Sequence, residues 1–336
     1  GGITLSSDGT SLLLDGTAIG GSPDLYAENY DGTSTLPSAT GTNAVAIGKS
    51  AVASGSSGFA SGNGATASGA NSVALGRANT ASGSNSFAFG FSNTASATYS
   101  VAIHGNATAD ETTAIGRNSS GQPANAVTGQ GAMALGGSYA SGADSFAAAI
   151  ANNTSSYGAT GSNSVAMVRN SKASGSDSLA FGRTSQATTS YAVAMGYNCL
   201  SAASYAVALG YQAQATGNNA FAAGASSTYQ ERANATASGA VALGGAYANG
   251  TDSVAIGASA KSTEIGKISF SNDKFSAVGD SQGGLFILRA DTTGATAEAL
   301  TTNNSTAATT NQVVLPNNSV YGFTGTITAR ENSAAT

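Results

Sequence analysis

A short apolar motif recurs along the chain, in which Ala stands between two larger apolar residues and Gly follows. It reads NAVAIG at 43–48, NSVALG at 71–76 and NSFAFG at 85–90. Within two runs the copies lie 14 residues apart, and this spacing predicts a structural unit repeated along one axis. The first apolar residues of the copies are Val45, Phe59, Val73, Phe87, Val101, and then Val165, Leu179, Val193, Val207 and Phe221.

Glycine divides each unit into two halves, because in the first run it falls at every seventh position from Gly48 to Gly90. A coiled coil has the same spacing, but one Gly in each heptad would cost about 1 kcal/mol in a helix. The stretches between glycines alternate and contain β-branched or aromatic residues, which is typical of short strands. We therefore expect an all-β parallel solenoid of strand, corner, strand and corner, with coils about 4.8 Å apart and a rod roughly 70 Å long.

Alternation within the strands assigns residues to two faces. It sends Val73 and Leu75 to one face and Ser72 and Ala74 to the other. A coil of this size has little interior, so we expect one layer of Val, Leu or Phe packed against a wall of small residues. Apolar residues remain on the second face, and we expect other copies of the chain to cover it, most simply three around an axis.

The repeat has irregular steps and distinct flanks. The segments 131–150 and 239–258 match each other, and each follows a step of 20 residues, which predicts loops at 117–130, 149–163 and 225–238 where specificity can reside. Three regions result: an N-terminal β attachment module and linker at 1–40, with a hairpin in 3–20, the rod at 41–260, and a C-terminal β cap at 261–336 that could begin a further β domain. Strands are predicted in the cap at 267–270, 284–291, 312–316 and 320–331.

Composition excludes several functions. Charged residues make up only 9% of the chain and the net charge is −5, so nucleic acid is not an expected partner. There is one Cys and one His, which cannot build a His/Cys metal cluster in a single chain, and we predict no metal and no cofactor. No apolar run is long enough to span a membrane and the N-terminus lacks signal-peptide features, so we predict no membrane insertion.

The motifs NSVALG, NAVAIG and NSVAMV, each followed some eight residues later by a small-residue stretch ending in Ser-Gly, resemble the head repeat of YadA-like trimeric adhesins. The resemblance covers about 41–260. It implies a left-handed parallel β-roll, a homotrimer, and binding to host surface molecules. Similar head repeats occur in phage tail fibres and appendages, and residues 311–332 resemble segments that follow such repeats there. The expected heptad stalk and membrane anchor of a bacterial adhesin are not seen in this sequence.

Few residues suggest chemistry. His104 interrupts its motif as VAIHG, and we interpret it as a β-bulge, with a ligand contact or an ion on the trimer axis as the alternative. A glycan-cleaving site would need two carboxylates about 5–10 Å apart. Asp110 and Glu111 are the best adjacent acids, but in a strand their side chains would diverge. We expect a corner-capping role for three other acids that share one position, Asp144, Asp177 and Asp252.

Two surface patterns are candidate contacts. Tyr191, Tyr197, Tyr205 and Tyr211 fall at two equivalent positions of adjacent coils, so each pair should stand about 5 Å apart as a receptor-binding patch or a purely structural aromatic stack. A second set follows the end of the motif and forms either a solvated stripe or a track for an anionic glycan. Its members are Lys49, Arg77, Arg117, Arg169 and Arg183.

The sequence therefore favours a non-enzymatic structural protein. We predict a homotrimeric β-roll rod of a phage virion, a tail fibre or appendage whose partners are other virion tail proteins and a host cell-surface glycan or protein. The alternatives are the head of a bacterial trimeric autotransporter adhesin at the cell surface, a glycan-degrading tailspike, and a passive spacer between an anchor and a tip.

Overall fold

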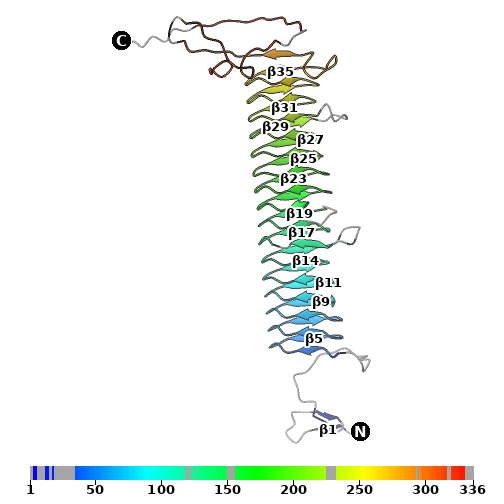
Figure 1. The fold of residues 1–336 in the computed structure, drawn as a ribbon. Helices are drawn as coiled ribbons and strands as arrows, with labels where there is room; N and C mark the ends of the chain where they lie inside the picture. The colour runs from blue at the N-terminus through cyan, green and yellow to red at the C-terminus, as the bar shows by residue number, and fades with distance from the viewer. Residues whose placement is uncertain are drawn as a thin grey trace, which may run out of the picture.

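The protein is an all-β rod in a computed structural model (Figure 1). The structure describes residues 3–5, 12–14, 17–18, 35–117, 121, 123–126, 128–149, 156–224, 232–292, 294, 296–315 and 319–329. Those residues contain no helix, and so none that could cross a membrane. The expected parallel solenoid is confirmed, with about 15 turns of roughly 14 residues.

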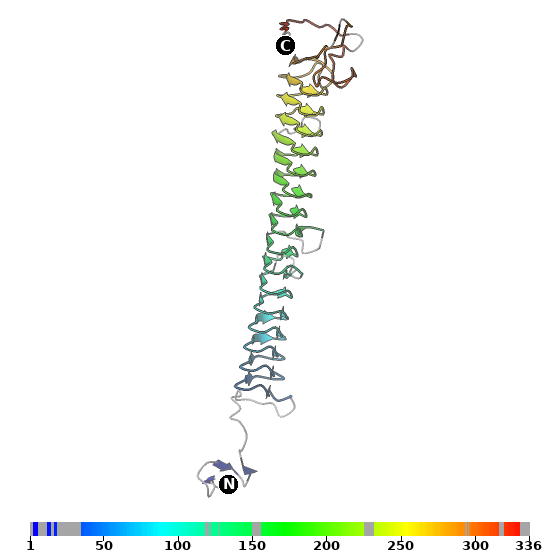
Figure 2. The same ribbon diagram turned by 90° about the vertical axis from the view of Figure 1, so that its left-hand side faces the viewer.

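Two parallel sheets run along the rod, and each coil contributes one strand to each of them (Figures 1 and 2). The sheet with the longer strands is called the long sheet and the other the short sheet. The long sheet contains β5 (Val45–Ile47), β7 (Phe59–Ser61), β9 (Val73–Arg77), β11 (Phe87–Phe91), β13 (Val101–Ile103), β15 (Thr113–Ile115), β17 (Met133–Leu135), β19 (Phe146–Ala148), β21 (Val165–Met167), β23 (Leu179–Phe181), β25 (Val193–Tyr197), β27 (Val207–Tyr211), β29 (Phe221–Gly224), β31 (Val241–Leu243), β33 (Val254–Ile256) and β35 (Ile268–Phe270).

The short sheet contains β4 (Ser38–Ala39), β6 (Val52–Ala53), β8 (Thr66–Ala67), β10 (Thr80–Ala81), β12 (Thr94–Ala95), β14 (Gly105–Ala107), β16 (Ala124–Ala126), β18 (Tyr139–Ala140), β20 (Gly158–Ala159), β22 (Lys172–Ala173), β24 (Gln186–Ala187), β26 (Leu200–Ser201), β28 (Gln214–Ala215), β30 (Asn234–Ala235), β32 (Tyr247–Ala248) and β34 (Lys261–Ser262). In both sheets, equivalent residues of successive coils pair in register, as Ala74 does with Ala88. Backbone hydrogen bonds such as Val73 N–H to the Ser86 carbonyl, at 2.9 Å, join the coils.

The interior of the coil is built from small residues, and the expected internal layer of Val, Leu or Phe is wrong. The central Ala of nearly every long-sheet strand and the second residue of nearly every short-sheet strand are fully buried, as Ala74 and Ala81 are. Val73 and Leu75 point outward and are only half-buried. The reason is width: two strands joined by such short corners lie too close together to hold a larger side chain between them.

Two backbone features form the corners. The residue two positions before each long-sheet strand has a positive φ, 52° at Asn71 and 55° at Asp177, and Asn and Asp tolerate this region well. Asp144 and Asp252 have the same conformation, so the predicted corner position of these acids is confirmed. Glycine meets a second need, because a Cβ on Gly69 would overlap the carbonyl of Gly83 in the next coil.

Interior polar side chains bond the coils to one another. Asn79 Nδ2 donates to the carbonyls of Leu75 and Gly90, and Asn79 Oδ1 accepts from the backbone N–H and the side-chain Nδ2 of Asn93. At the same position of later coils, other side chains repeat the bond to a glycine carbonyl 11 residues ahead. They are Ser171, Ser185 and Cys199, which donate to Gly182, Gly196 and Gly210.

The irregular coils differ from their expected shapes. His104 lies in a corner with φ 54°, not in a bulge, and its coil is shortened, because Val101 pairs with Thr113 only 12 residues later. The interval from Gly90 to Gly105 wrongly indicated a bulge, because His104, and not Gly105, takes the place of Gly90 in this coil.

The extra residues of the long coils all fall between a long-sheet strand and the following short-sheet strand. Parts of the predicted loops belong to the rod instead, since β16, β20 and β30 lie inside 117–130, 149–163 and 225–238. Positions 118–120, 122, 127, 150–155 and 225–231 of those loops lie outside the described residues.

The flanks carry little further strand. At the N-terminus β1 (Ile3–Leu5), β2 (Leu12–Leu14) and β3 (Thr17–Ala18) form an antiparallel sheet, so the predicted hairpin is confirmed. At the C-terminus, the strand predicted at 267–270 appears as β35, and β36 (Gly283–Leu285) pairs with it. The described parts of 286–291, 312–316 and 320–331 contain no strand, contrary to expectation, and Ile287 and Val320 are largely exposed without a sheet to pack against.

Candidate functional site

The outer face of the long sheet is an apolar surface. The first and third residues of each strand point away from the alanine interior, and in most coils both are Val, Leu, Ile, Met or Phe. They are half-buried or exposed in the single chain: Phe89 is 44% exposed and Phe181 is 42% exposed. Their columns continue from β5 to β35 without a charged residue.

Two columns of residues border this face, one at each end of the strands. The upstream column holds the residues two positions before the long-sheet strands, and it contains the exposed acids Glu111, Asp144, Asp177 and Asp252. The downstream column holds the residues four positions after the first residue of each strand. It contains the exposed cations Lys49, Arg77, Arg117, Arg169 and Arg183. The two borders of the face therefore differ in sign.

The four candidate tyrosines form two stacked pairs, one in each column. Tyr191 and Tyr205, upstream, have ring centroids 4.8 Å apart with planes 4° apart, and Tyr197 and Tyr211, downstream, lie 5.0 Å apart. The predicted spacing within each pair is thus found. The pairs occupy opposite ends of β25 and β27, so in one chain they make two patches and not one. Within each pair one face of each ring covers one face of the other.

Two cations of the downstream column lie over aromatic rings. The guanidinium of Arg183 lies 5.5 Å from the ring centroid of Tyr197, and that of Arg77 lies 5.3 Å from the ring of Phe91. Arg117 donates to the carbonyls of Gly121 and Phe91, at 3.0 and 3.4 Å. The stripe predicted from sequence is therefore partly a stack of arginine and aromatic side chains. Phe91 was missed as a member of this stripe because it is not a cation.

The candidate acids are held apart. Asp110 and Glu111 lie in a turn and not in a strand, and they still diverge: Asp110 Oδ1 accepts from the backbone N–H of Thr98 at 2.9 Å, and Glu111 Oε2 accepts from Gln130 Nε2 at 3.2 Å. His104 is exposed and its ring meets that of Phe89 edge-on. Within the described ranges no three His, Cys, Asp or Glu residues are grouped so that they could hold a metal ion.

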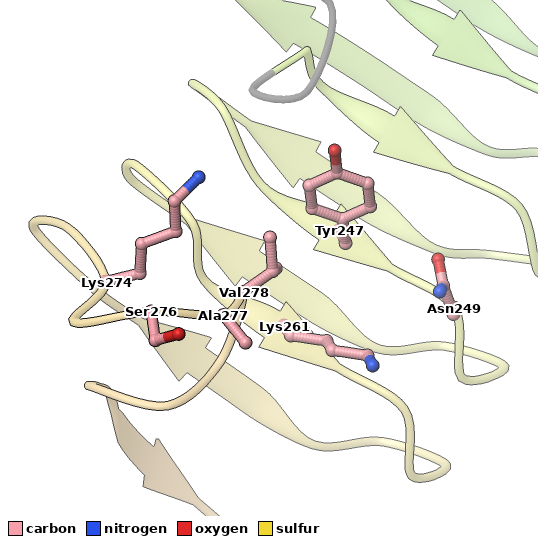
Figure 3. A pocket seen from close by; sticks show the side chains of 7 residues that line it. All are labelled: Tyr247, Asn249, Lys261, Lys274, Ser276, Ala277 and Val278. Carbon is pink, nitrogen blue, oxygen red and sulfur yellow. The ribbon is translucent and has the colours of Figure 1, made fainter.

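A cleft of about 380 Å³ lies at the C-terminal end of the rod (Figure 3). Tyr247 and Lys261 line it from β32 and β34, and Lys274 and Val278 line it from the following turn. The ammonium groups of its two lysines point to different sides in Figure 3, and no carboxylate is among the lining residues. The turn is fixed by Asp280, whose pKa is lowered by hydrogen bonds from the backbone N–H groups of residues 275–277.

Cys199 is not exposed as a reactive thiol. It is only 1% exposed in the coil interior, where its Sγ lies 3.0 Å from the Gly210 carbonyl. Burial raises the pKa of its thiol, so the thiolate is disfavoured. Its role is that of the Ser residues at the same position of neighbouring coils.

Comparison with known proteins agrees with this geometry. The YadA head domain repeat matches residues 39–65, 53–79, 81–103, 173–198, 202–227 and 248–265. No curated protein sequence matches the chain. The unmatched intervals 104–172 and 228–247 include residues of the coils of irregular length, but the two sheets continue through both without a break. The matched segments of the rod are therefore YadA-like head repeats.

Proposed function

We propose that the protein is a non-enzymatic, homotrimeric rod that attaches a larger assembly to a host surface. The observation that carries the proposal is the continuous apolar outer face of the long sheet. Two columns about 7 Å apart along a rod of about 70 Å give a face on the order of 500–1,000 Å². The largest apolar patch on a typical monomer is about 300–600 Å², whereas a stable interface takes about 800 Å² from each partner.

Copies of the same chain fit this face best. It is flat and regular, with a repeat of about 4.8 Å, so a second rod of the same repeat matches it along the whole length. The resemblance to YadA-like heads supports three copies around a common axis. Light scattering on the purified chain tests this: we expect a mass of three times 32.3 kDa, and a monomer at micromolar concentration would contradict the proposal.

The proposed setting is a phage virion, in which the rod serves as a tail fibre or appendage next to other tail proteins. The resemblance of residues 311–332 to segments of phage fibre proteins supports this setting. The head of a bacterial adhesin is the second candidate, and the match to the YadA head repeat supports it equally. Gold-labelled antibody against the rod should mark tails of purified particles in the first case and the bacterial envelope in the second.

The proposed activity is binding, to a glycan or protein of the host surface, and not cleavage. The separate partners of Asp110 and Glu111 support this, because a glycosidase needs two carboxylates directed at one bond. Incubation of the purified protein with host polysaccharide should release no new reducing ends. Candidate binding residues are the two tyrosine pairs, and replacing Tyr191 and Tyr205 by Ala should reduce attachment to host cells.

A further inference from the structure

In seven coils the residues of the upstream and downstream columns are chemically matched, whereas Asn85 has Phe91 and Asp252 has Ala258 at the downstream end of its coil. Each described cation of the downstream column belongs to a coil whose upstream residue has a side-chain oxygen. Each of the two downstream tyrosines belongs to a coil whose upstream residue is also a tyrosine. The matched pairs, upstream residue first, are Asn43 and Lys49, Asn71 and Arg77, Glu111 and Arg117, Asn163 and Arg169, Asp177 and Arg183, Tyr191 and Tyr197, and Tyr205 and Tyr211.

Within one chain the matched residues do not meet. They are six residues apart at opposite ends of an extended strand, a separation on the order of 15–20 Å. Arg183 instead lies over Tyr197 of the next coil, and Asp177 accepts a hydrogen bond from Asn163 of the preceding one. The match between the two columns therefore stabilises nothing in an isolated rod.

A ring of copies brings the two columns together. In a closed ring whose axis follows the rod, every chain presents the downstream end of its long sheet to the upstream end of the next chain, at the same height. An arrangement with rods in opposite directions would instead place unrelated coils side by side. The opposite signs of the two borders favour the first arrangement.

We infer that the two columns form the seams between copies. At each seam Arg183 of one copy pairs with Asp177 of the next, and Arg117 pairs with Glu111 in the same way. Tyr197 and Tyr211 of one copy join Tyr191 and Tyr205 of the next in a single cluster of four rings. Each chain carries only half of that cluster, so the candidate receptor contact is completed by a second copy. This inference rests on the proposed trimer.

Cysteine pairs at one height test the seam. In a Cys199→Ser background, Asp177→Cys and Arg183→Cys are combined in one chain and oxidised. Because a disulfide needs Cα atoms within about 7 Å, these two cysteines cannot join within one chain. We expect a covalent trimer on a non-reducing gel, and the same product from Tyr191→Cys with Tyr197→Cys. Each single variant should run as a monomer.

Mismatched pairs provide the control, since Asn71→Cys with Arg183→Cys lies seven coils out of register and should give no covalent trimer. The inference is overturned if both matched pairs stay monomeric on the gel while light scattering reports an intact trimer. If light scattering reports a monomer for the unmodified protein, the proposed trimer itself fails. A covalent dimer from both matched pairs would support the seam but replace the three copies by two.

Discussion

The interior Asn79 offers the sharpest test of how the coils are held together. Its amide donates to the carbonyls of Leu75 and Gly90 and accepts two hydrogen bonds from Asn93, and it is fully buried. The equivalent residue of the preceding coil is Ala65, so Ala fits the position without overlap. Asn79→Ala therefore removes hydrogen bonds from the structure with little change in packing.

The expected loss follows from the number of bonds. A buried hydrogen bond contributes about 0.5–1.5 kcal/mol net, so four of them amount to roughly 2–6 kcal/mol. Asn79→Ser should cost less, because Ser171 and Ser185 at the same position each retain the bond to a glycine carbonyl. The predicted order of stability is wild type, then Asn79→Ser, then Asn79→Ala.

Urea unfolding of the three proteins, followed by circular dichroism and by hydrogen exchange of the peptide around 75–93, measures these differences. Exchange locates the effect, since neighbouring coils unfold semi-independently in a solenoid. An Asn79→Ala protein with wild-type stability, or a Ser variant less stable than the Ala variant, would refute the hydrogen-bond account of the interior.

Three further predictions concern the outer face, the thiol and the C-terminal turn. Phe89→Asp places a charge in the proposed interface, where an unpaired ion costs several kcal/mol, so light scattering should show monomers; a trimer of unchanged stability would contradict this. Native Cys199 should react with a disulfide reagent far more slowly at pH 8 than the unfolded chain does, and reaction within seconds would show that the interior opens. Backbone hydrogen bonds lower the pKa of Asp280 from its ordinary value of 3.8, so its carboxylate stabilises the turn at pH values above 3.8. As the pH falls through the lower folded value, the turn should lose this stabilisation, seen as faster amide exchange of Phe275, Ser276 and Ala277 after correction for intrinsic rates; Asp280→Asn should lack this pH dependence.

The repeat and its coil could be predicted from spacing alone, because residues 14 apart that pair in register must be chemically alike. Which side of the strand points inward could not be predicted from the spacing. Alternation separates Val73 from Ala74 but does not say which points inward, and the preference for large apolar cores led to the wrong choice. The constancy of Ala at that position, against Val, Leu or Phe beside it, was the signal that this position of the strand points inward.

The candidate site was predicted in its parts and not in its arrangement. Stacking of Tyr191 on Tyr205 follows from the coil repeat, and the structure has it. The separation of Tyr191 from Tyr197 depends on where the strand begins and ends, which spacing does not give. His104 was misplaced for a related reason, since a missing pair of corner residues and an inserted residue both disturb the glycine count.

The alanine interior has a consequence for how such a rod can change over time. Since the inward position of nearly every long-sheet strand is already filled by Ala, selection has almost nothing to adjust there. Outward positions are free of that restriction, and each recurs once per coil. Single outward side chains, spaced about 4.8 Å apart along the rod, can thus be exchanged while the backbone of the coils stays the same.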